Sequence, residues 1–433
     1  MRFRRRTGRS RRRRSVLLAL LVAIALADTA TLAGAAVLHV RRLERASGTN
    51  AVTAPEVVAE RREGPFTATI DYAALFSADG HQVSSEVRWA DDWFFQDATE
   101  YNHDLAHTCA VLSAVANAES AYYQQGSSAP AYAEQAFAEL GFEEVSTASY
   151  RYRSEVLDEV LGVVDGTDVV AYTLATRHVT NSETGEERLL TVVVVRGSYG
   201  SEWLSNARIE SAEDATGDGD HLGFTLAAEE IVADLEERAA ELDPSVERSY
   251  LFCGHSRGAA VASLLASYVD DVPALASTED VRAYGFATPN CTSSTEARSA
   301  RYDNIFNVLN PSDVVTSLPP AAWGYDRYGQ DVWLPGEGDA SLAALLPRMR
   351  AAYLETMGVA CPADPSDRSV VGELAERLAD AAPSLEALAS PLTWPDVAAA
   401  LVDADLPGLL SSHYPNTYIA WLEATDAGDL TFS

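Results

Sequence analysis

A serine between two glycines is the first feature of this sequence that could do chemistry. It lies within residues 251–265, LFCGHSRGAAVASLL. The apolar residues before it predict a strand and the small residues after it a helix, so the serine would lie on a tight strand-to-helix turn, as a nucleophilic serine does. Glycines two positions away on either side remove Cβ atoms that would clash in such a turn. Five residues form this predicted turn: Gly254, His255, Ser256, Arg257 and Gly258.

A serine hydroxyl is a weak nucleophile, so it needs a histidine as base and an acid that orients the histidine. In proteins with a serine turn of this kind, the acid comes after the serine in the sequence and the histidine comes after the acid. Of the eight histidines, only His413 lies after an acid that follows Ser256, and we predict that it is the base. Asp313 is the predicted acid because it directly follows the strand-like stretch NIFNVLN, whereas Asp303 precedes this stretch and would lie at the opposite edge of the sheet.

Ester cleavage by a serine also needs hydrogen-bond donors for the oxyanion. One predicted donor is the backbone N–H of Arg257, directly after the nucleophile. The other is Ser198, which follows the β-branched stretch of VVVVRGSYG. As alternatives, Ser198, Asp313 and His413 could be ordinary loop or turn residues, and Ser256 could lie in a turn without chemistry.

The elements that must position these residues follow from hydrophobic periodicity. Helices are predicted over 103–124 and 224–242, and residues 169–177 and 189–197 predict a hairpin whose second strand is buried on both faces. After them, strands over 249–254, 281–287 and 304–310 and a helix over 257–269 predict a largely parallel sheet with helices on both faces. Residues 336–407, rich in alanine and leucine, predict a helical insertion near the sheet's C-terminal edge.

Five ordered motifs between Val192 and Pro320 resemble the class 3 lipase family, the α/β-hydrolases that are similar to fungal triacylglycerol lipases. They are VVVVRGSYGSEWLSN, GDHLGF, LFCGHSRGAAVA, YGFATPN and NVLNPSDVVTSLPP. The resemblance implies the α/β-hydrolase fold, with Ser256 as nucleophile, Asp313 as acid, His413 as base, and Ser198 and Arg257 as oxyanion donors. It also implies that His221 is structural. Residues 205–219 depart from the family pattern, because they are polar and acidic where the fungal enzymes carry an apolar lid.

These features predict a serine hydrolase that cleaves carboxylic esters, of lipids or small molecules, through an acyl-enzyme intermediate. The expected mechanism uses no metal and no organic cofactor, and no Cys-x-x-Cys spacing or His/Cys cluster indicates a metal site. Two alternatives stay open within enzymes, a phospholipase A and an acyltransferase, because a fold does not fix the final acceptor. A third alternative is a catalytically silent surface protein that uses the fold for binding.

Charge divides the chain into a basic beginning and an acidic body. The net charge is −32, every basic residue is an arginine, and residues 46–433 hold 20 arginines against 62 acidic residues, a net charge near −42. Such a surface repels the phosphate backbone, so we expect no nucleic-acid partner.

The N-terminal residues predict an extracytoplasmic body. Residues 1–15 carry an arginine cluster, typical of a cytoplasmic end, and the apolar residues 16–40 are either a signal-anchor transmembrane helix or a signal peptide cleaved after Ala25-Leu26-Ala27. Residues 41–65 are predicted to be a linker and 66–433 a single hydrolase domain. The four cysteines are compatible with an oxidising compartment, and Cys253 is expected to be a buried thiol.

Overall fold

The computed structural model describes the main body of the chain with several gaps. The structure describes residues 59, 62, 64–74, 81–125, 131–151, 170–197, 220, 222–243, 245–271, 275–276, 278–363, 368–382, 384, 387, 393, 396 and 411–433. The predicted basic segment 1–15, the apolar segment 16–40, Ser198, residues 205–219 and His221 lie outside these ranges. No helix within the described ranges has the length and apolar character needed to cross a bilayer.

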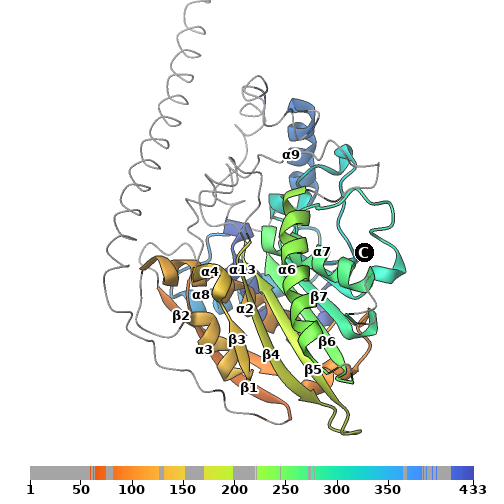
Figure 1. Ribbon diagram of the computed structural model, residues 1–433. Coiled ribbons are helices and arrows are strands. Elements are labelled where there is room, and N and C mark those ends of the chain that lie inside the picture. Colours follow the sequence, from red (N-terminus) through yellow and green to blue (C-terminus); the bar gives the residue numbers. More distant parts are fainter. Residues whose placement is uncertain are drawn as a thin grey trace, which may run out of the picture. The chain divides into compact units, whose positions relative to one another are not determined.

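Eight of the described strands form a central sheet (Figure 1). Its order across the sheet is β10 (Thr431–Phe432), β9 (Gln330–Trp333), β8 (Ile305–Leu309), β7 (Val281–Phe286), β6 (Arg248–His255), β5 (Glu187–Val195), β4 (Tyr172–Thr180) and β3 (Glu144–Ser146). Strands β5 to β9 are parallel, while β3, β4 and β10 are antiparallel to their neighbours. This arrangement confirms the predicted α/β fold with a largely parallel sheet and the predicted β4–β5 hairpin.

Helices cover both faces of the sheet and enclose two apolar cores. Helices α6 (Leu222–Glu241) and α7 (Arg257–Asp271) lie on one face, and α2 (His103–Gln125) lies on the other (Figure 1). Strand β5 serves both cores, because Val192 and Val194 face α2 while Val193 and Val195 face α6 and α7. The period-2 alternation of a strand explains this division and confirms that β5 is buried on both faces.

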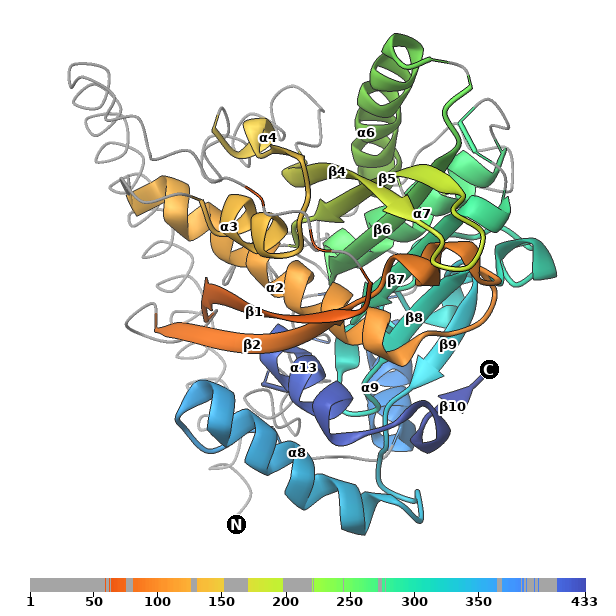
Figure 2. The same ribbon diagram turned by 90° about the horizontal axis from the view of Figure 1, so that it is seen from below.

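A separate two-stranded sheet, which the sequence analysis did not predict, extends the core on the α2 side. Strands β1 (Phe66–Ala73) and β2 (Gln82–Trp89) pair antiparallel, and α2 packs against them (Figure 2). The missed signal is the alternation in β2, where every second residue from Val83 to Trp89 is buried. Nearby lie the shorter elements η1 (Asp91–Phe95), α3 (Tyr132–Glu139) and α4 (Ala148–Arg151).

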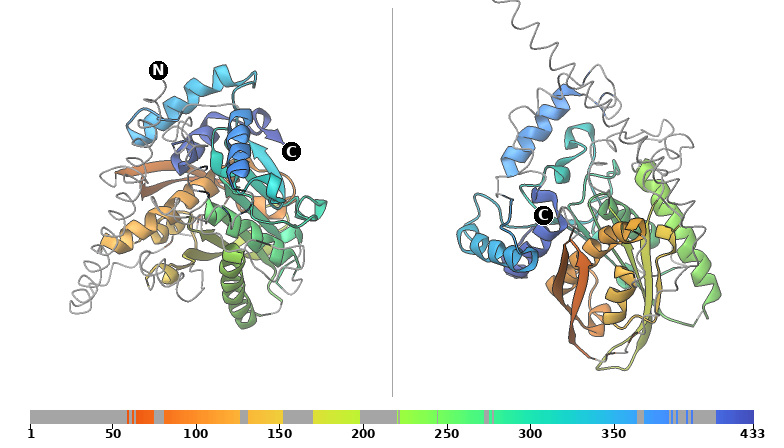
Figure 3. Two further views of the ribbon diagram at one scale, coloured as in Figure 1. Left: turned by 90° about the horizontal axis from the view of Figure 1, so that it is seen from above. Right: turned by 90° about the vertical axis from the view of Figure 1, so that its left-hand side faces the viewer.

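Helices beyond β9 occupy part of the predicted insertion 336–407. Helix α8 (Leu342–Met357) packs against α13 (Pro415–Ala424), and α9 (Arg368–Ala381) packs against the short helices η5 (Val314–Ser317) and η6 (Ala321–Trp323) (Figure 3). The remaining short helices are η3 (Thr278–Asp280), η4 (Ala300–Tyr302) and η7 (Ala427–Asp429). Because η5 directly follows Asp313, α9 adjoins the loop that carries the predicted acid.

Candidate active site

The structure places Ser256 on a sharp turn between β6 and α7. Strand β6 ends at His255 and helix α7 begins at Arg257, so a single residue connects them. Ser256 has φ of 58°, in the left-handed region that a residue with a Cβ rarely adopts. Its N–H donates to the Phe286 carbonyl at the end of β7, at 2.8 Å, which holds the turn against the sheet.

The glycines of the turn are needed because backbone passes close to both. A Cβ at Gly254 would overlap the backbone of Gly258 one turn ahead, and a Cβ at Gly258 would overlap the Val195 carbonyl of β5. These clashes involve backbone atoms, which cannot rotate away as the end of a side chain can. The close packing of β6, α7 and β5 therefore excludes every larger residue from both positions.

Ser256, His413 and Asp313 form a continuous chain of hydrogen bonds. His413 Nε2 lies 3.0 Å from Ser256 Oγ, and His413 Nδ1 lies 2.8 Å from Asp313 Oδ2. An ionised carboxylate can only accept, so Nδ1 carries the proton and Nε2 is the acceptor for the serine hydroxyl. This tautomer is the one in which a histidine can take a proton from serine. Residues far apart in the chain thus meet in the order that the sequence predicts for a triad.

Asp313 is held by donors from its own loop and from a distant helix. The residue directly precedes η5, is 0% exposed, and accepts from the Val315 N–H at 2.9 Å. The Tyr418 hydroxyl of α13 donates to the same Oδ2 that faces His413, at 2.7 Å. Burial and the nearby Asp313 raise the pKa of Tyr418 well above its usual value, so it remains a donor. Asp303 lies before β8, away from this cluster, as expected.

The backbone around His413 is held by side chains from several parts of the fold. Three consecutive carbonyls each accept one side-chain hydrogen bond, at 2.7 to 2.9 Å: Ser411 from Thr417 Oγ1, Ser412 from Asn310 Nδ2, and His413 from His255 Nε2. Asn310 follows β8 and His255 ends β6, so residues at the ends of two sheet strands hold the backbone of His413. Nothing in the sequence singled out Asn310 or Tyr418, except that polar residues adjoin the predicted loop and histidine.

His255 is a neutral hydrogen-bond donor next to Ser256. Burial, helped by the neighbouring His413, lowers the pKa of His255 well below its ordinary value. Because a carbonyl can only accept, the Nε2 of His255 carries the proton in its 2.7 Å contact with the His413 oxygen. The two imidazole rings have centroids 4.8 Å apart. His255 had been predicted only as part of the turn.

Of the two predicted oxyanion donors, the structure describes one. Arg257 is the first residue of α7, so its backbone N–H lies at the N-terminal end of this helix. Ser198 lies outside the described residues, but its neighbour Gly197 is described. The Gly197 N–H donates to Asn117 Oδ1 of α2 at 2.8 Å, and a Cβ at Gly197 would overlap the His255 carbonyl. The chain leading to Ser198 therefore runs directly against the serine turn.

Metal binding near the site would need several histidine, cysteine or acidic side chains close together. Among the described residues, no group of three histidine, cysteine or acidic side chains is arranged to hold a metal. Cys253 is a buried thiol in β6, on the α2 side of the sheet. The candidate site is therefore a serine, a histidine and an aspartate beside a helix N-terminus, which is the equipment of acyl transfer.

Residues 192–323 match the family model of class 3 lipases. The match confirms the predicted resemblance to this family. The matched segment begins within β5, ends with η6 and contains Ser256 and Asp313, whereas His413 lies beyond it. A comparison with the curated proteins found no match.

Several solved structures are similar to parts of the chain. A triacylglyceride lipase of Rhizomucor miehei is 20% identical, over 41% of this chain and 75% of that one, with a TM-score of 0.29. A triacylglycerol lipase described as having a serine protease triad is 18% identical over 56% and 83%, with a TM-score of 0.36. A mutant form of MDLA from Penicillium cyclopium is 21% identical over 55% and 83%, with a TM-score of 0.34.

Proposed function

We propose that this protein is a serine hydrolase that cleaves lipid esters through an acyl-enzyme intermediate. The class 3 lipase match supports hydrolysis of lipid esters as the reaction class. The observation that carries the proposal is the unbroken chain from Ser256 Oγ through His413 to Asp313, with contacts of 3.0 and 2.8 Å. A silent binding protein would have no use for this arrangement, so the geometry favours an enzyme.

In the proposed reaction, His413 Nε2 takes the Ser256 proton while Oγ attacks the ester carbonyl carbon. The N–H of Arg257 and the donor groups of Ser198 stabilise the oxyanion that forms. His413 then gives its proton to the leaving alcohol, which leaves an acyl group on Ser256. A water molecule attacks this acyl group by the same sequence and releases the acid. Asp313 keeps His413 in the required tautomer and stabilises its positive imidazolium form during both acylation and deacylation.

The test uses a fluorophosphonate probe and nitrophenyl esters of increasing acyl length. Wild-type protein, purified as the full chain in detergent, should be labelled and should show a clear chain-length optimum. Ser256→Ala should lose labelling and lower kcat by about 10⁴-fold or more, because the covalent intermediate cannot form. Labelling of a folded Ser256→Ala protein would move the nucleophile elsewhere. Product analysis with phospholipid, with and without an acceptor alcohol, separates the phospholipase A and acyltransferase alternatives.

We also propose that the enzyme acts outside the cytoplasm. This rests on residues 1–40, an arginine cluster followed by an apolar segment. Cell fractionation with N-terminal sequencing distinguishes the two routes. An intact N-terminus in the membrane fraction supports an anchor, and a new N-terminus close to residue 28 supports a cleaved signal. Recovery of the intact chain from the cytoplasm would contradict both.

A further inference from the structure

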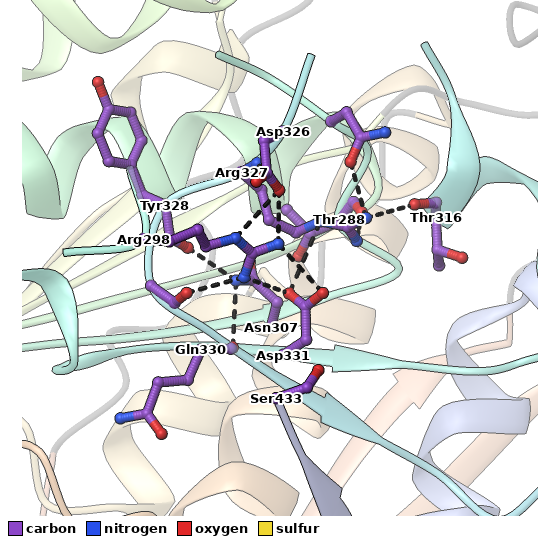
Figure 4. Close-up of polar contacts among 12 residues, drawn as sticks. Thr288, Arg298, Asn307, Thr316, Asp326, Arg327, Tyr328, Gln330, Asp331 and Ser433 are labelled. Atoms are coloured by element: carbon purple, nitrogen blue, oxygen red, sulfur yellow. Dashed lines mark hydrogen bonds and ion pairs between the residues drawn. The ribbon is translucent and has the colours of Figure 1, made fainter. Parts of the chain in front are cut away.

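Arg327 is a buried arginine to which the proposed reaction assigns no role. It lies just before β9 and is 5% exposed. Its Nη1 donates to the Thr288 carbonyl at 2.9 Å, and its Nη2 donates to Asn290 Oδ1 at 2.7 Å and to the Thr316 carbonyl at 2.6 Å (Figure 4). One guanidinium thus joins two other loops to the segment before β9.

The two loops that Arg327 joins are those next to the proposed acid. Thr288 and Asn290 follow β7, and Thr316 lies in η5, three residues after Asp313. The η5 turn holds Asp313 twice. The Val315 N–H donates to its carboxylate at 2.9 Å, and Thr316 Oγ1 donates to its backbone carbonyl at 2.8 Å. The carbonyl that Arg327 holds therefore belongs to the same turn that holds the acid.

The chemistry of the guanidinium suits this junction. Thr288, Asn290 and Thr316 present oxygen atoms from different directions, and a planar group with several donors can satisfy all three at once. A lysine at the same place would be a point charge on a flexible stem. Asn290 strengthens the junction, because its Nδ2 donates to the Pro319 carbonyl at 2.7 Å.

An acidic residue balances the buried charge of Arg327. Asp331 Oδ1 lies 3.7 Å from its Nε, and both side chains are less than a tenth exposed. Arg298 also pairs with Asp331, at 2.9 and 3.1 Å, and with Asp326 at 2.6 Å (Figure 4). The side-chain hydrogen bonds of Arg298 stay within residues 326–331, and its side chain is about a third exposed. The two arginines share one acidic cluster, but Arg327 reaches the loop of the acid.

The positive charge of Arg327 also acts on Tyr418, which donates its hydroxyl hydrogen bond to Asp313. Burial and Asp313 raise the pKa of Tyr418, and the positive charge of Arg327 opposes that rise. Arg327 therefore acts on the acid loop both through hydrogen bonds and through its field.

We propose that Arg327 is a positioning residue of the triad, whose guanidinium holds the η5 turn so that the Asp313 carboxylate meets His413. This inference rests on the proposed serine hydrolase function. The guanidinium of Arg327 contacts Thr288, Asn290, Thr316 and Asp331, so it would act on His413 through Thr316 and Asp313.

The experiment compares Arg327→Met with Arg298→Met in the full chain. The control removes an arginine from the same acidic cluster but leaves the contacts to Thr288, Asn290 and Thr316. Three quantities are measured: kcat and KM on a nitrophenyl ester, thermal unfolding, and the low-field proton NMR signal of the His413 Nδ1–H bonded to Asp313. Arg327→Met should lower kcat by about 10- to 100-fold with little change in KM, and should lose or shift the signal. Arg298→Met should lose stability but keep both kcat and the signal.

The proposal is wrong if folded Arg327→Met matches Arg298→Met in kcat and in the low-field signal. If Arg327→Met does not fold, Arg327→Lys replaces it, since a lysine keeps the charge without the three-way contact. Arg327→Lys should then show a lower kcat than Arg298→Met and a shifted signal, and equality would overturn the proposal. If wild-type protein shows no turnover and no probe labelling, the proposed function fails, while the NMR signal still decides whether Arg327 positions Asp313.

Discussion

His255 Nε2 donates a 2.7 Å hydrogen bond to the backbone carbonyl of His413, so the residue beside the proposed nucleophile holds the proposed base. Because Ser256 follows His255 directly, one movement of this turn would move the serine and the histidine together. The contact links the end of a central strand to a segment 158 positions further along the chain. Serine and base are thereby placed by one part of the sheet.

A neutral His255 makes folding sensitive to acid. Burial lowers the pKa of His255 well below its ordinary value, so the folded chain binds this proton less readily than the unfolded chain. Its contribution to the unfolding free energy is complete above about pH 6.5 and is lost as pH falls below that value, by at most about 1.4 kcal/mol per pH unit. Chemical denaturation at several pH values should show a steeper loss for wild type than for His255→Gln. His178→Gln, at an exposed position, is the control and should follow wild type. Equal slopes for wild type and His255→Gln would contradict this explanation.

The two aspartates at opposite ends of β8 should differ in importance. Asp313→Asn keeps the shape of the side chain but removes the charge that orients and stabilises His413, and should lower kcat by about 10⁴-fold. Asp303→Asn should leave kcat close to wild type, because Asp303 lies before the strand. Ester hydrolysis by both variants, with folding checked by circular dichroism, decides the point. The reverse ranking would reject Asp313 as the acid.

Tyr418→Phe should lower both stability and activity without leaving a cavity. The change removes the 2.7 Å donor to Asp313 Oδ2 but keeps the buried ring, and Val315 and His413 still contact the carboxylate. We expect the unfolding free energy to fall by about 2 kcal/mol, as for a hydrogen bond to a charged group, and kcat/KM to fall about tenfold. The matched control is Tyr353→Phe in α8, whose kcat/KM should stay near wild type. Equal kcat/KM for the two variants would show that Tyr418 only fills space.

Gly258→Ala should destabilise the protein because the added methyl group overlaps the Val195 carbonyl of β5. The Val195 carbonyl is backbone and cannot rotate away as a flexible side chain can, so β5 and α7 must separate. We expect this to lower the free energy of unfolding by about 1–3 kcal/mol or more. Gly372→Ala in α9 is the matched control. Its Cβ meets nothing within 4 Å, and alanine is the better helix former by about 1 kcal/mol. The midpoint temperature of thermal unfolding should therefore fall for Gly258→Ala and rise for Gly372→Ala. A shift in the same direction for both variants would refute the steric explanation.

Local patterns predicted the central part of the fold. The apolar run to Gly254, the small residues after Gly258 and the β-branched β5 correspond to elements whose periodicity depends only on near neighbours. The β1–β2 sheet was missed although β2 alternates clearly, because only three of the eight residues of β2 are apolar. The α/β architecture followed from the alternation of strands and helices, without knowledge of any contact.

The sequence by itself determined the turn around Ser256, and chain order selected Asp313 and His413 as its expected partners. Only the tertiary structure decided which groups hold these partners: His255 on the His413 carbonyl, Tyr418 on Asp313, and Arg327 on the adjoining turn. The Tyr418–Asp313 bond joins residues 105 positions apart, and a hydrogen bond forms or fails within a few tenths of an ångström. Periodicity places residues on faces of elements, whereas distances of that size depend on how strands, helices and loops pack in three dimensions.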